Sequence, residues 1–119
     1  MKMGNKIFNR VFAPVNNDRM DKTVLNALAL KTVFVCPVPM FDDIKDRSDL
    51  FEKYIHQEMS DFDPDNDIIA DFGDSMIFAM MAFYVGRYYD YLYVARYNRR
   101  SGNYTIRLIN GEDESWSTT

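Results

Sequence analysis

The sequence predicts a small single α+β domain, in which an antiparallel sheet with a C-terminal β-hairpin packs against two to three helices. Two segments, 88–97 and 104–109, alternate their side chains between two faces around a connection that contains Gly102. From Ser48 onward, apolar residues instead repeat at helical spacing. A chain of 119 residues that is 47% hydrophobic can bury a core without disulfides or metals. We expect one domain over residues 1–109 and a flexible acidic tail over residues 110–119.

The N-terminal third predicts helical segments followed by one strand. Apolar side chains at helical spacing indicate a short helix before Pro14: Ile7, Phe8, Val11 and Phe12. Asp18 or Asp21 is suited to cap a second helix that runs through Leu30. Residues 32–36 are β-branched or apolar and precede Pro37, which predicts a buried strand.

The middle of the chain predicts two helices on either side of an acidic connector. The first carries one apolar stripe, with charged residues outside it: Leu50, Phe51, Tyr54, Ile55 and Met59. Asp74 or Ser75 is suited to cap the second helix, Met76 to Val85, and Gly86 is expected to end it. Because this segment is apolar on every side, we expect it to be central and nearly fully buried.

The predicted hairpin carries aromatic and basic side chains that are typical of interfaces. One strand face collects tyrosines, and arginines, including Arg107, gather around the tip. A Tyr and Arg surface also suits stacking and binding of a single nucleic-acid strand. Alternatively, the Tyr face packs under the helices and its hydroxyls reach solvent. The second candidate surface is therefore Tyr89, Tyr91, Tyr93, Arg96, Arg99 and Arg100.

Catalytic motifs are missing from the sequence, so we expect a protein that is not an enzyme and holds no cofactor or metal. The single histidine, His56, falls on the polar side of a predicted helix, and the single cysteine, Cys36, falls in an apolar strand. No P-loop, dinucleotide fingerprint or zinc spacing occurs. One cysteine excludes an intrachain disulfide, and neither a signal peptide nor a membrane span is predicted. These features favour the cytoplasm.

One acidic block concentrates the charge of the chain. No Lys or Arg occurs between Lys53 and Arg87, whereas the chain as a whole has a net charge of −4. The block consists of Glu58, Asp61, Asp63, Asp65, Asp67, Asp71 and Asp74. It is open to three interpretations: a solvated loop, a calcium loop, or a mimic of the phosphates of a nucleic acid. The calcium loop is disfavoured because Asn66 and Phe72 replace the Gly and Glu of an EF-hand.

These features predict a small non-catalytic inhibitor or regulator whose acidic block covers a basic, nucleic-acid-handling protein. In design, this combination resembles the small inhibitors of bacteriophages and mobile elements, such as anti-CRISPR and anti-restriction proteins. The resemblance implies a bacterial or phage cytosolic setting. From the acidic block we expect a basic protein as the partner, with no direct binding of nucleic acid and no membrane. An immunity or antitoxin protein that neutralises a toxin enzyme is the alternative, together with a calcium-binding module. A homodimer is compatible with each of them.

Overall fold

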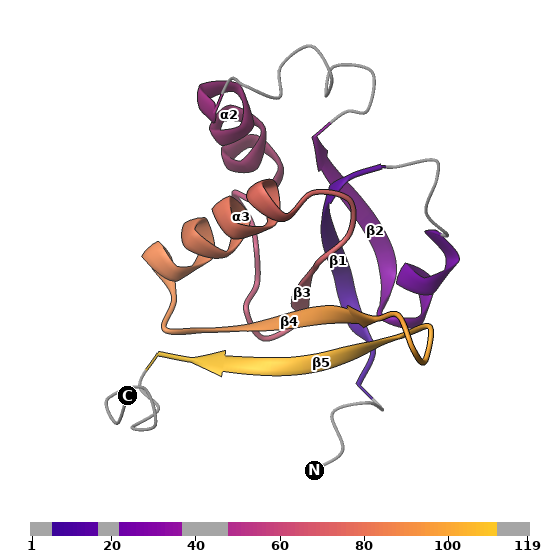
Figure 1. The fold of residues 1–119 in the computed structure, drawn as a ribbon. Coiled ribbons are helices and arrows are strands. Elements are labelled where there is room, and N and C mark those ends of the chain that lie inside the picture. The colour runs from indigo at the N-terminus through magenta and orange to yellow at the C-terminus, as the bar shows by residue number, and fades with distance from the viewer. Residues whose placement is uncertain (1–5, 17–21, 37–47, 112–119) are drawn as a thin grey trace, which may run out of the picture.

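The computed structural model describes residues 6–16, 22–36 and 48–111. These residues form eight helices and strands (Figure 1). In chain order they are β1 (Phe8–Val15), the 3-10 helix η2 (Lys22–Ala27), β2 (Ala29–Cys36), α2 (Ser48–Glu58), β3 (Asp67–Ala70), α3 (Ser75–Tyr88), β4 (Tyr91–Asn98) and β5 (Asn103–Asn110). The predicted acidic tail lies outside the described residues from position 112 onward.

The sheet is mostly parallel, so the expectation of an antiparallel α+β sheet was wrong. Among the described residues, five strands pair in the order β2-β1-β3-β4-β5. β1 is parallel to β2 and to β3, and β3 is parallel to β4. Within the part of the chain that the structure describes, only β4 and β5 pair antiparallel, which confirms the C-terminal hairpin. The architecture is a compact α/β domain, because each parallel connection crosses over through a helix.

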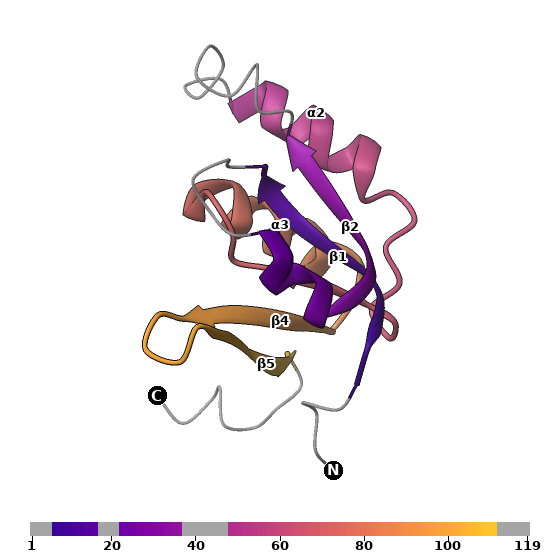
Figure 2. The same ribbon diagram turned by 90° about the vertical axis from the view of Figure 1, so that its right-hand side faces the viewer.

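The helices cover both faces of the sheet (Figure 2). Strand order changes direction at β1, and right-handed crossovers then place η2 on one face and α2 and α3 on the other. Alternate residues of β1 confirm this arrangement. Phe12 packs in the cluster under α2 and α3, whereas Val11 packs with Leu25 of η2. The structure therefore has two apolar layers around one sheet.

The prediction of a short helix before Pro14 was wrong. Residues 8–15 form a strand that lies between β2 and β3, and residues 11–15 are all buried. A strand that is covered on both faces has a continuous apolar run, which a short helix also produces. Pro14 is tolerated because the pairing between β1 and β3 ends at Phe12.

Two further boundaries differ from those predicted. The helix expected to run through Leu30 is the short 3-10 helix Lys22–Ala27, and β2 begins at Ala29 rather than at Thr32. Its predicted caps, Asp18 and Asp21, lie outside the described residues. β3 was not predicted, because its four residues follow directly on the acidic connector.

The two long helices were predicted correctly in place but only partly in burial. In α2, the buried side chains Phe51 and Ile55 belong to the predicted stripe, and its last member, Met59, is buried directly after the helix. α3 begins after Asp74, whose Oδ1 accepts a hydrogen bond from the N–H of Ile77 (2.8 Å), but it continues past Gly86. α3 is not fully buried, because Phe83 is 71% exposed and Met76 is 66% exposed. Among the described residues, no helix is both long and apolar enough to cross a membrane.

Candidate functional site

β3 divides the acidic block between the two ends of the sheet. Asp67 is the first residue of β3, and Asp71 follows its last residue. About 13 Å of extended backbone therefore separates these two positions. Asp74 lies beyond Asp71 and caps α3, whereas Glu58 ends α2 before the connector 61–67. The carboxylates that are contiguous in sequence do not form one continuous surface.

Asp67 is a structural residue with a buried carboxylate. Its side chain is 1% exposed. Arg10 binds it with two nitrogens: Nη2 lies 2.6 Å from Oδ2, and Nε lies 3.2 Å from Oδ1. The backbone N–H of Asp63 also donates to Oδ2 at 2.8 Å. Arg10 reaches Asp61 as well, through Nη1 to Oδ1 at 2.9 Å. The role of Arg10 was not predicted from the sequence, although it is the only charged residue in the mainly apolar segment 7–15.

Hydrogen bonds hold the remaining connector carboxylates in a defined turn. Asp63 accepts from the side chain of Asn66 (2.8 Å) and from the backbone N–H of Asp65 (3.0 Å), and these bonds lower the pKa of Asp63. Asp65 accepts from the Tyr91 hydroxyl at 2.6 Å. The hydrogen bond from Arg10 lowers the pKa of Asp61. Within the described ranges, no group of three His, Cys, Asp or Glu residues is placed to hold a metal ion.

The tyrosines of the second candidate surface contact the body of the protein. Tyr93 packs edge-on against Phe8, with ring centroids 5.0 Å apart, on the face that carries η2. Tyr89 follows α3 instead of lying on β4, and its hydroxyl donates to the carbonyl of Phe62 at 3.3 Å. Tyr91 is bound to Asp65, as described above. The tyrosines and Arg96 therefore do not form one surface.

The arginines do come together, in a groove of about 830 Å³ that we call the Arg groove. Its lining consists of Asp71, Val94, Arg96, Tyr97, Asn98, Arg99, Arg100, Thr105 and Arg107. It lies beside the carboxyl ends of β3 and β4, on the sheet face that carries α3, because Val94 packs toward the α2 and α3 cluster. Figure 1 shows that α3 does not cover the β4–β5 connection.

Strand register and turn chemistry build this groove. Arg96 pairs with Thr105, and Val94 pairs with Arg107, so Arg96 and Arg107 are diagonal neighbours about 7–8 Å apart on one face. At the tip, the Asn98 side chain accepts from the N–H of Arg100 at 3.0 Å. Gly102 adopts a positive φ of 72° and donates its N–H to the Asn98 carbonyl at 2.8 Å. The tip therefore places Arg99 and Arg100 beside the two strand arginines.

The Arg groove concentrates positive charge that the described part of the chain does not neutralise. None of its four arginines forms an ion pair with a described residue, in contrast to Arg10. Asp71 is the only carboxylate among the described lining residues. Like charges on one strand face destabilise a sheet. The hairpin register could have predicted Thr105 and Asn98 as lining residues, whereas Asp71 comes from a distant part of the chain.

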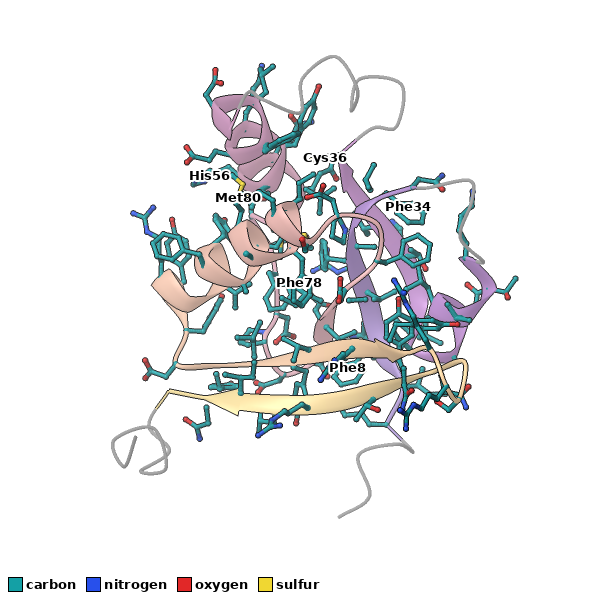
Figure 3. All side chains as sticks on the ribbon, viewed as in Figure 1. Phe8, Phe34, Cys36, His56, Phe78 and Met80 are labelled. Carbon is teal, nitrogen blue, oxygen red and sulfur yellow. The ribbon has the colours of Figure 1, made fainter. Side chains whose placement is uncertain are left out.

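The two residues considered for nucleophilic chemistry do not join this groove. Cys36 is fully buried at the end of β2, and burial raises the pKa of its thiol to about 11. His56 is an exposed residue of α2 (Figure 3). Its ring meets that of Tyr84 edge-on, with centroids 4.9 Å apart. Neither residue lines the Arg groove.

The Arg groove is the candidate site because it combines four exposed guanidiniums with an open surface. The acidic connector is a second exposed surface, at the opposite end of β3. Comparison of the chain with protein-family models, with curated proteins and with solved structures finds no match to any of them.

Proposed function

We propose that this protein is a non-catalytic binding protein that holds a single nucleic-acid strand by its phosphates in the Arg groove. The supporting observation is that four guanidiniums line one groove without a carboxylate partner in the described part of the chain. Each guanidinium has five N–H donors in a planar fork, which fits a phosphate bidentately. A phosphate ligand would balance positive charge that the single lining carboxylate, Asp71, does not neutralise.

The other lining residues favour a nucleic acid over an acidic protein. Asn98 and Thr105 supply further polar groups, and Val94 is the only aliphatic residue among the described lining. Protein–protein interfaces usually have an apolar centre, whereas interfaces with nucleic acids are more polar and more positive. Tyr97 also contributes to the lining, and its ring packs edge-on against that of Tyr104, with centroids 5.4 Å apart.

The test is direct binding of labelled single-stranded DNA and RNA, followed by fluorescence anisotropy over a range of salt concentrations. Four phosphate contacts predict a slope of log K against log salt of about −2.8. The Arg99→Ala/Arg100→Ala variant should bind at least tenfold more weakly and lower the magnitude of the slope by about 1.4. A matched control, Lys31→Ala/Lys53→Ala, removes the same charge from exposed positions outside the groove and should change affinity little. Equal affinities for the wild type and the arginine variant would contradict the proposal.

A second candidate function uses the acidic connector to block a basic, nucleic-acid-handling protein or a toxin. It is favoured by the rigidity of the turn, in which Asp61 and Asp65 remain exposed while hydrogen bonds hold the backbone. The lowered pKa values of Asp61 and Asp63 favour their charged forms. Preorganised charges of one sign accelerate association with an oppositely charged partner.

One set of variants distinguishes the two functions. The acidic candidate predicts that the protein does not bind free nucleic acid but competes with it for a basic partner. It also predicts that Asp61→Asn/Asp63→Asn/Asp65→Asn weakens partner binding at least tenfold, whereas the arginine variant does not. Asp67 is left unchanged because its carboxylate is buried and ion-paired. Direct binding to single-stranded DNA that is lost in the arginine variant would exclude the acidic candidate.

A further inference from the structure

α3 exposes an apolar stripe opposite to its buried one. Phe83 is 71% exposed and Met76 is 66% exposed, whereas Ile77, Met81 and Val85 face the core. Between α2 and α3 lies a groove of about 270 Å³, lined by Glu52, Ile55, His56, Ala79, Met80, Phe83, Tyr84 and Arg87. Figure 3 shows His56 and Met80 on the two neighbouring helices at this groove. Exposed apolar clusters with polar rims are typical of protein-binding surfaces.

The charges at this groove are arranged as a pair of opposite sign. Glu52 comes from α2 and Arg87 from α3, and neither forms an ion pair with another described residue. The ring of His56 contacts the ring of Tyr84 in the lining of this groove. Glu52 precedes His56 by one helical turn, and Arg87 follows Tyr84 by about one turn. Because the ends of α2 and α3 pack together through Met59 and Val85, the two charges lie toward opposite ends of the groove.

We propose that this α2–α3 face binds the same face of a second copy of the chain, in a two-fold dimer. A two-fold axis through the apolar centre turns one copy by 180°, so Glu52 of each copy lies opposite Arg87 of the other. Phe83 and Met80 then pack against their counterparts and lose their exposure to water. The net charge of −4 disfavours random self-association, but Glu52 and Arg87 balance each other within this face.

Among the described residues, none lines both the α2–α3 face and the Arg groove. Loss of the dimer and loss of nucleic-acid binding are therefore separate outcomes, and a two-fold dimer presents two Arg grooves. Only a second copy of the chain carries both charges, so only a dimer pairs Glu52 of each copy with Arg87 of the other. The experiment therefore tests whether Glu52 and Arg87 pair between copies.

The experiment measures the mass of the full chain in solution by sedimentation equilibrium from low to high micromolar concentration. The wild type should change from a 14.0 kDa monomer to a dimer of twice that mass. Glu52→Arg and Arg87→Glu should each weaken dimerisation at least tenfold, because each creates two like-charge contacts across the interface. Mixing these two variants should restore a heterodimer, because both contacts then join opposite charges. Circular dichroism should show that each variant is folded.

Lys53→Glu is the matched control, since it changes the charge at an exposed position of α2 outside the groove and should leave dimerisation intact. Phe83→Ser removes the apolar centre and should yield a folded monomer. A wild type that stays at 14.0 kDa at every concentration would overturn the proposal. So would a mixture of the two charge variants that stays monomeric, which would instead assign the face to a different partner.

Discussion

Replacing Asp67 with Ala is expected to lower the free energy of unfolding by about 3–5 kcal/mol, the usual cost of removing one partner of a buried ion pair. Asp67 is 1% exposed and accepts hydrogen bonds from Arg10 at 2.6 and 3.2 Å. The variant leaves the Arg10 guanidinium and the Asp63 N–H without this acceptor. Urea denaturation followed by circular dichroism measures the change.

Asp61→Ala is the control, because it removes the other carboxylate that Arg10 binds. The Asp61 side chain is 74% exposed, so water replaces its contacts and the loss of stability should be far smaller. Equal losses in the two variants would show that Arg10 acts as a surface cation and that the burial of Asp67 has no special weight. Replacing the Asp67–Arg10 pair together with apolar residues should recover part of the loss, since buried pairs are often neutral against apolar packing.

The acidic connector shows how far a charge pattern can be read from sequence. Asp61, Asp63, Asp65 and Asp67 alternate regularly, which suggests a row of equivalent surface charges. In the structure these four carboxylates have different roles. Asp67 is the first residue of a buried strand. Asp63 accepts a hydrogen bond from Asn66 within the turn, and Asp65 accepts one from the Tyr91 hydroxyl. Nothing local distinguishes Asp67 from its neighbours, because its partner Arg10 is far away in the sequence.

Local signals predicted the hairpin and α2 correctly. The hairpin is joined by a short connection with Gly102 at a positive φ, and α2 has one solvated face that gives a clear helical period. The parallel strands gave weaker signals. β1 is covered on both faces, which removes the alternation that identifies a strand, and β3 has only four residues. Parallel pairing also joins segments that are distant in the chain.

In the candidate site too, contacts within the hairpin could be predicted from the sequence, whereas contacts between distant segments could not. Arg96, Arg99 and Arg100 were predicted to gather because a hairpin brings its own residues together. Asp71 was assigned to the acidic block, yet it lines the Arg groove, because β3 carries it to the carboxyl end of the sheet. The order of strands was needed to separate the two surfaces. Sequence proximity therefore indicated that the hairpin arginines lie close together, but it did not indicate that Asp71 lies beside them.

The composition of α3 did not indicate which of its faces is buried. A matched pair of variants tests the two faces. Apolar residues surround this helix, so the sequence predicted uniform burial. The structure buries Met81 completely and leaves Phe83 71% exposed. Met81→Ala should therefore lower the free energy of unfolding by about 2–5 kcal/mol, through lost apolar burial and the cavity left behind.

Phe83→Ala removes a larger side chain from the same helix but should change the stability of the monomer by about 0.5 kcal/mol or less, as at other surface positions. Denaturation is measured at low protein concentration, because dimerisation would stabilise the wild type by mass action and make Phe83 seem important for the monomer. At high concentration the wild type should gain stability and Phe83→Ala should not. A large loss in Phe83→Ala at every concentration, with little loss in Met81→Ala, would show that the two faces of α3 are reversed. A concentration-dependent difference between Phe83→Ala and the wild type would instead locate the contribution of Phe83 in the contact between copies.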